Sequence, residues 1–327
     1  MRYLSYFLPL LLLFLSACRS DSETRILRLG HGLDTAHPVH LGMEFMARSL
    51  DTLSGGALQI MIYPNQQLGT ERQNLELLQI GSLAMTKVSA AVLENFAPPT
   101  RVLSLPYLFR SREHAYAVQD SEVGRELLLA SEPSRLRGLA YFDAGQRSFY
   151  TKERPVRTPE DLAGLKIRVQ ESATAINMVR QLGGAPTPIS WGELYTALQQ
   201  GVVDGAENNP PSFYNSGHYE VAKFYSLNEH TAVPDILIMS SPVYNGLSAR
   251  ERGWLDEAVR RAVAFQRRLW QQSEAEALAA VEAAGVEVIR PNKVAFMDRT
   301  AAILEGYRDD PEAYALIQRI QAIPDAR

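Results

Sequence analysis

The residues best suited to binding chemistry lie near the ends of short apolar segments. In 165–169, apolar residues alternate with Lys166 and Arg168, and this period of two predicts a β-strand. Arg168 lies toward the carboxyl end of that strand, where its guanidinium can bind a carboxylate through two parallel hydrogen bonds. The pattern leaves a second interpretation open, in which Arg168 is a solvated arginine at the edge of a sheet.

Two further segments have aromatic or polar side chains where predicted elements begin or end. Trp191 falls in the first turn of a helix predicted to begin at Ser190, where a tryptophan either covers a ligand or packs as a core residue. The acids and amides of 203–211 (VDGAENNPP) follow a predicted strand and precede two prolines. They either cap the next turn or face a ligand, and both alternatives stay open.

Sequence signatures of enzymes are missing. The chain has no H-E-x-x-H, no G-x-S-x-G, no Walker loop and no complete G-x-G-x-x-G after a predicted strand. Its only cysteine is Cys18, which leaves no other thiol for a nucleophile or a thiolate metal site. We therefore predict a protein that is not an enzyme and has no cofactor and no metal, with an exported hydrolase or lyase as the alternative.

The overall composition is that of an ordinary globular protein. The 327 residues are 46% hydrophobic and 21% charged, and this length is sufficient for two domains with sizeable cores. The net charge is -4 and basic runs are absent, so the chain is not expected to bind nucleic acid.

The first residues predict export. Arg2 precedes an apolar run over 4–14, which is shorter than the roughly 20 residues that span a bilayer, so 1–17 is interpreted as a signal peptide. The ending Leu15-Ser16-Ala17-Cys18 resembles the lipobox of bacterial lipoproteins. That resemblance implies a lipid-anchored, extracytoplasmic protein with acylated Cys18 and a polar tether over 18–25. A chance cysteine after an ordinary signal is the alternative.

The remainder alternates between strand-like and helix-like segments. Strands are expected at 26–29, 58–63, 83–88, 139–142, 148–150, 165–169, 202–206 and 286–289, with helices at 39–53, 70–80, 172–183 and 190–200. This order predicts an α/β fold with largely parallel sheets. Ligands in such sheets bind at the carboxyl ends of the strands.

A long helix is expected near the C-terminus. Ser248 and Glu251 form a capping-box pattern, and no proline follows until after Gly285. About 36 helical residues would extend roughly 54 Å, which exceeds one small lobe, so the helix should span two. We assign 26–144 and 234–272 to lobe I, and 145–233 and 273–327 to lobe II.

The motifs together resemble one family, the solute-binding proteins of tripartite ATP-independent periplasmic (TRAP) transporters. The resemblance covers about 27–323. It is carried by YPNQQLG (63–69), LPYLF (105–109), LKIRV (165–169), LGGAPTP (182–188) and ELYTALQQGVVDGAEN (193–208). It implies a two-lobed periplasmic binding protein fold with mixed, mostly parallel sheets. It also implies closure onto a small organic acid and delivery to the membrane subunits of a TRAP transporter.

The same resemblance implies roles for individual residues. Arg168 corresponds to the arginine that pairs with the substrate carboxylate, Arg147 to a second arginine near it, and Asn208 to an asparagine that also reaches it. Trp191 occupies a position whose aromatic ring stacks on the ligand.

Four more residues are implied at the far end of the solute. Glu71 and Ser89 fall where family members vary the residue that contacts that end, and His31 and His230 fall near the same cleft. This polar far end suits hydroxyl groups, so we predict a sugar acid, a hexuronate such as glucuronate or galacturonate. C4-dicarboxylates, keto acids and aromatic acids stay open, as does a role as a ligand-binding sensor.

Overall fold

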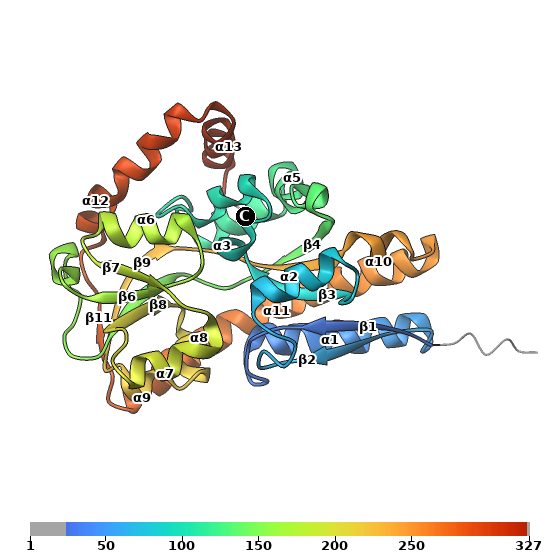
Figure 1. The fold of residues 1–327 in the computed structure, drawn as a ribbon, viewed down its shortest axis with the longest axis horizontal. Coiled ribbons are helices and arrows are strands. Elements are labelled where there is room, and N and C mark those ends of the chain that lie inside the picture. Colours follow the sequence, from blue (N-terminus) through green and yellow to red (C-terminus); the bar gives the residue numbers. More distant parts are fainter. Residues whose placement is uncertain (1–23, 326–327) are drawn as a thin grey trace, which may run out of the picture.

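The computed structural model describes residues 24–325. The predicted signal peptide, Cys18 and most of the predicted tether lie outside the described residues. The chain is built on two β-sheets with helices around them (Figure 1). Within residues 24–325, no helix is both long and apolar enough to cross a membrane.

The first sheet has five strands, and we call the part of the molecule built on it lobe I. Its strands are β1 (Arg25–Gly30), β2 (Leu58–Tyr63), β3 (Met85–Ser89), β4 (Leu136–Phe142) and β10 (Asp235–Ser240). Their order is β2-β1-β3-β10-β4. β1 is parallel to β2 and β3, whereas β10 is antiparallel to both β3 and β4.

The second sheet has six strands, and we call the part built on it lobe II. Its strands are β5 (Arg147–Thr151), β6 (Lys166–Val169), β7 (Ala185–Pro188), β8 (Gly205–Asn208), β9 (Phe224–Thr231) and β11 (Glu287–Ile289). Their order is β11-β9-β5-β8-β6-β7. β5 is antiparallel to β8 and β9, and the other pairs are parallel. Both sheets are therefore mixed, which confirms the predicted fold class.

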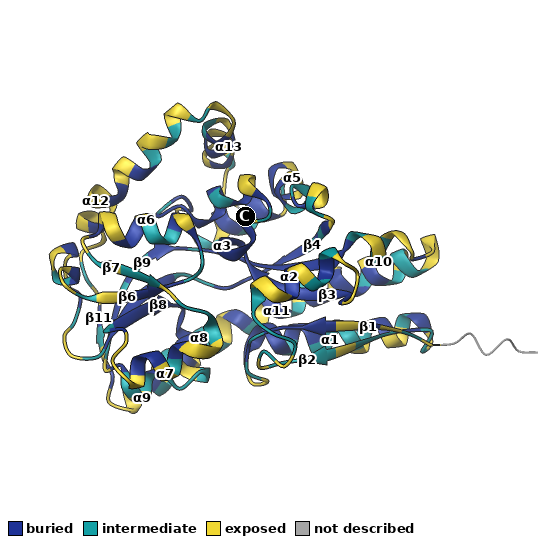
Figure 2. Cartoon of the chain, viewed as in Figure 1, coloured by how far each residue is buried: buried dark blue, intermediate teal, exposed yellow. Residues whose placement is uncertain are grey.

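The helices lie around the sheets, and most of them bury one face, so most of the strands lie in the interior (Figure 2). Those of lobe I and its borders are α1 (Pro38–Ser54), α2 (Glu71–Gln79), α3 (Ala90–Leu93), α4 (Arg112–Gln119), α5 (Glu122–Leu129) and α10 (Ser241–Asn245). The others are α6 (Ala173–Gln181), α7 (Leu194–Gln199), α8 (Pro210–Asn215), α9 (His218–Val221), α11 (Ala249–Ala283), α12 (Lys293–Gly306) and α13 (Pro311–Ala322). Five 3₁₀ turns are η1 (Pro98–Ser104), η2 (Glu132–Ser134), η3 (Pro159–Leu162), η4 (Trp191–Glu193) and η5 (Tyr307–Asp309).

Helix capping follows the sequence in two places and departs from it in a third. The helix expected from residue 70 begins with a capping box of Thr70 and Gln73, and the expected capping box of Ser248 with Glu251 is formed. The single helix expected from Ser190 to Gln200 is wrong, because the segment is the turn η4 followed by α7. There Ser190 Oγ donates to Glu193 Oε2 at 2.8 Å instead of capping a backbone N–H.

The chain passes between the sheets at three places. Residues 143–146 join β4 to β5, residues 232–234 join β9 to β10, and α11 contacts α1 and β4 on one side and α8 on the other. α11 is 35 residues long, which confirms the predicted helix along both lobes. Gln266 of α11 holds the first crossing, since its side chain accepts from Asp143 N at 2.9 Å and donates to Asp143 O at 2.8 Å.

Candidate ligand-binding site

A cavity lies between the two sheets, where the carboxyl ends of their parallel strands face each other. About 710 Å³ of space lies between its walls, counting the open solvent at its mouth. Lobe I contributes loops after β1 and β2 together with β3 and the start of β10, and lobe II contributes β5, β6, β8 and the segment after β7. Its polar and aromatic lining includes Gln66, Lys87, Arg147, Arg168, Trp191 and Asn208.

Arg168 is a buried cation without an acidic partner. It is 3% exposed, on β6, and its Nε donates to the carbonyl oxygen of Ile189 at 2.8 Å. Among the described residues, no hydrogen bond or ion pair involves its two terminal amino groups, which belong to the cavity wall. Burial lowers the pKa of Arg168, because removal from water penalises its charge, and the attraction of Glu207 and Glu71 does not outweigh this penalty. This end of the cavity therefore favours an anion.

Arg147 lines the same cavity but its charge is already neutralised. Its Nε and Nη2 donate to the two carboxylate oxygens of Glu207 at 2.5 and 2.8 Å, and its Nη1 donates to Asn208 Oδ1 at 2.9 Å. Burial raises the pKa of Glu207, but Arg147 outweighs this effect and holds it at about 2. Of the two arginines singled out in the sequence, only Arg168 has its terminal amino groups free for a ligand.

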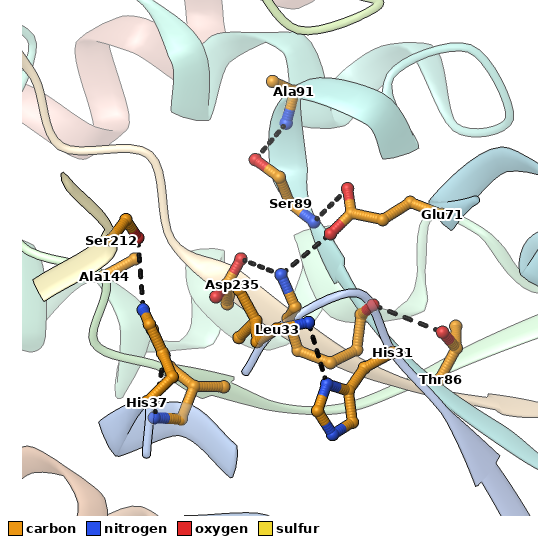
Figure 3. A network of polar contacts seen from close by, with 12 residues as sticks. His31, Leu33, His37, Glu71, Thr86, Ser89, Ala91, Ala144, Ser212 and Asp235 are labelled. Carbon is orange, nitrogen blue, oxygen red and sulfur yellow. Dashed lines mark hydrogen bonds and ion pairs between the residues drawn. The ribbon is translucent and has the colours of Figure 1, made fainter. Parts of the chain in front are cut away.

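A second charged cluster, which we call the Lys87 cluster, comprises Lys87, Glu71 and Asp235 on the lobe I wall. Lys87 Nζ lies 2.8 Å from Glu71 Oε1 and 3.1 Å from Asp235 Oδ1, so the two carboxylates converge on one ammonium (Figure 3). Burial lowers the pKa of Lys87, yet the two carboxylates outweigh it and the pKa is raised. Burial raises the pKa of Asp235, with Lys87 opposing and Glu71 adding to the rise.

Ser89 lies behind the Lys87 cluster and does not itself line the cavity. Its backbone N–H donates to Glu71 Oε2 at 3.2 Å (Figure 3), and its hydroxyl donates to Gln170 Oε1 at 3.3 Å. Glu71 and Gln170 both line the cavity. Of the two residues expected at the far end of the solute, Glu71 is therefore at the surface of the cavity and Ser89 holds it in place.

Trp191 forms one side of the cavity and also packs against the apolar cores of both lobes. The guanidinium carbon of Arg168 lies 6.0 Å from the centre of its ring, at the outer limit of a cation–π contact. Trp191 therefore packs as a core residue, and because the same ring also lines the cavity, its role in covering a ligand stays a prediction.

The two histidines singled out in the sequence lie one layer behind the cavity wall. His31 is fully buried, with its Nε2 3.0 Å from His40 Nδ1, and burial lowers its pKa to about 3. His230 stacks on Phe149 with 4.5 Å between ring centres, and its Nε2 lies 3.4 Å from Glu207 Oε2. Neither histidine is among the residues that line the cavity.

Lys87, Asp235 and Gln66 were missed by the sequence reasoning. Lys87 is the only charged residue of the strand MTKVS, whose five residues are all buried, and a buried lysine is normally paired. Gln66 and its neighbour Asn65 have positive φ values of 58° and 53°, and the Gln66 Nε2 atom is buried without a hydrogen-bond partner in the described chain. Residues 24–325 contain no group of three His, Cys, Asp or Glu side chains able to hold a metal ion.

Comparison with known proteins identifies the family. The model of bacterial extracellular solute-binding protein family 7, DctP, matches residues 29–310. A solute-binding protein of Chromohalobacter salexigens is 33% identical over 288 residues, which are 88% of this chain and 86% of that protein.

Solved structures agree with this match. A TRAP periplasmic solute-binding protein from Bradyrhizobium sp., in complex with galacturonate, has a TM-score of 0.88 and 41% identity, covering 91% of this chain and 99% of that one. Another from Anaerococcus prevotii, with bound glucuronate, has a TM-score of 0.89 and 36% identity, covering 91% and 97%. The chain therefore belongs to family 7 of the bacterial extracellular solute-binding proteins, the DctP family, whose members bind solutes and are not enzymes.

Proposed function

We propose that this chain is the solute-binding component of a TRAP transporter and that it binds a hexuronate such as galacturonate or glucuronate. The observation that carries the proposal is the unpaired, buried guanidinium of Arg168 at one end of a cavity between two lobes. A carboxylate there would accept two hydrogen bonds from the terminal amino groups and neutralise the charge. Asn208 and the Arg147–Glu207 pair would hold the neighbouring wall in position.

The remainder of the cavity supports a sugar acid over a simpler acid. Trp191 offers an aromatic face against which the C–H groups of a pyranose ring can pack. The Lys87 cluster, Gln66 and Gln170 place amide, ammonium and carboxylate groups on the wall, and such groups pair with hydroxyls. The structures with bound galacturonate and glucuronate, which are similar along nearly their whole length, add to this support.

A thermal-shift screen tests the proposal. Galacturonate and glucuronate should raise the melting temperature, because a ligand that binds only the folded state stabilises it by about 2.7 kcal/mol at 100 times its dissociation constant. Calorimetric titration of the acids that shift the melt then gives the affinity. A shift with succinate or a keto acid and none with either hexuronate would contradict the ligand class.

The proposal includes closure and delivery. Lobe I (26–144 and 234–272) and lobe II (145–233 and 273–327) would close over the solute about the crossings between β4 and β5 and between β9 and β10. The same hexuronate should therefore lower the radius of gyration measured by small-angle X-ray scattering.

Cells that lack this chain should lose uptake of that acid, and uptake that persists unchanged would contradict a role in transport.

The proposal also places the protein outside the cytoplasm on a lipid anchor at Cys18. The support is the sequence 1–18, in which an apolar run is followed by Ser16-Ala17-Cys18. Two or more acyl chains give stable membrane attachment, whereas one gives marginal binding. Cys18→Ser should move the protein from the membrane fraction to the soluble fraction after cell lysis, as measured by immunoblot. Equal membrane association of the variant and the wild type would rule out the anchor.

A further inference from the structure

We propose that the Lys87 cluster is a specificity element that excludes solutes with a second carboxylate at the lobe I wall of the cavity. This inference rests on the proposed function and narrows its ligand class to acids with one carboxylate and several hydroxyls. The cluster joins Lys87 of β3, Glu71 of α2 and Asp235 of β10 through contacts of 2.8 and 3.1 Å.

The hydrogen-bonding capacity of the cluster fits hydroxyl groups. The ammonium of Lys87 has three donors, of which one points to Glu71 and one to Asp235, so one is left. Glu71 accepts from Lys87 through one oxygen and from Ser89 N through the other, and a carboxylate has about four acceptor positions. One spare donor beside several spare acceptors suits vicinal hydroxyls, which both donate and accept.

One spare donor and several spare acceptors make the Lys87 cluster unfavourable for a carboxylate of the solute. An ionised carboxylate only accepts hydrogen bonds, so it would use the single spare donor and face the oxygens of Glu71 and Asp235. The cluster has one ammonium for two carboxylates, and it has no positive charge to spare even when Asp235 takes up a proton. Like charges brought together in a desolvated site are strongly disfavoured.

Burial makes this discrimination effective. Lys87 and Asp235 are 4% and 7% exposed, and the side chain of Glu71 is 15% exposed. Salt and water screen such groups much less than groups at the surface. The cavity is therefore asymmetric: on the lobe II wall, Arg168 has free terminal amino groups, while on the lobe I wall the only cation in the Lys87 cluster is already shared between two acids.

Calorimetric titration with galacturonate and with galactarate tests the inference in the wild-type protein. The two solutes have the same carbon number, and galactarate has a second carboxylate. We expect galactarate to bind at least about 100-fold more weakly, since juxtaposed like charges carry large penalties. Dissociation constants within about tenfold of each other would overturn the inference and leave the proposed function standing. If neither hexuronate binds, the proposed function itself fails.

Replacing the acidic residues of the cluster by neutral amides of the same shape distinguishes the effect of their charge from the effect of galactarate being an open-chain molecule. In Asp235→Asn and in Glu71→Gln, removal of one negative charge should reduce the ratio of the two dissociation constants by about tenfold or more. Glu76→Gln, an exposed position on the same helix as Glu71, is the matched control and should leave the ratio unchanged. If Asp235→Asn folds poorly, Glu71→Gln alone decides. If neither variant changes the ratio of the two dissociation constants, the carboxylates of Glu71 and Asp235 do not exclude the second carboxylate of the solute.

Discussion

Replacing Arg168 by methionine should abolish hexuronate binding while making the empty protein more stable. Loss of one partner of a desolvated charge pair costs about 2–5 kcal/mol, equivalent to roughly 30- to 5,000-fold in the dissociation constant. The unliganded variant, in contrast, loses a buried charge that has a lowered pKa and no ion pair with any residue of 24–325, and an apolar side chain of similar length avoids the cost of burying that charge. Titration calorimetry measures the first effect and thermal unfolding without ligand measures the second.

Arg168→Lys is the matched control for this variant. Lysine keeps the positive charge but lacks the planar fork that holds both carboxylate oxygens, so its affinity should fall between those of the wild type and Arg168→Met. Wild-type affinity in Arg168→Met would remove the arginine from the site. A large loss of stability in the same variant would show instead that Arg168 has a structural role.

Arg147→Met, in contrast to Arg168→Met, should strongly lower the stability of the unliganded protein. The change leaves Glu207, which is 2% exposed, without the guanidinium that binds both its oxygens. Breaking a buried pair by removing one partner costs about 3–5 kcal/mol. Urea denaturation should therefore show a lower midpoint with little change in slope.

A double variant tests whether the unpaired acid is the cause. Arg147→Met combined with Glu207→Gln removes the orphaned charge, so it should recover a large part of the stability lost in Arg147→Met alone. If the single variant unfolds at the wild-type midpoint, the pair does not support the cavity wall. If the double variant is no more stable than the single one, the cost does not come from Glu207.

The contrast between the two arginines marks the limit of sequence reasoning at this site. The motifs place Arg147 and Arg168 in one functional group, and the alternating pattern of 165–169 correctly predicts the strand that carries Arg168. Which guanidinium is free depends on Glu207 and on the pairing of β5 with β8. That pairing joins segments about sixty residues apart, and no local pattern specifies it.

The secondary structure was likewise predicted where neighbouring residues specify it and missed where they do not. β1, β2, α1 and α2 were predicted nearly to the residue because their periodicities and caps are local. β10 was missed because all six of its residues are buried, and the apolar run at its centre, 236–239, carries no alternation. The Lys87 cluster was missed with it, since Asp235 reaches Lys87 from 148 residues away.

The central position of β10 makes lobe I a discontinuous folding unit. β10 lies between β3 and β4, so a nascent chain that ends before Asp235 leaves β3 with an open edge and β4 without a partner strand. Pairing over so long a loop is slow, because the entropy of closing the loop is lost before the contacts form. The polypeptide must complete every strand of lobe II except β11 before lobe I can close, and late completion prolongs the time during which the chain is extended and unpaired.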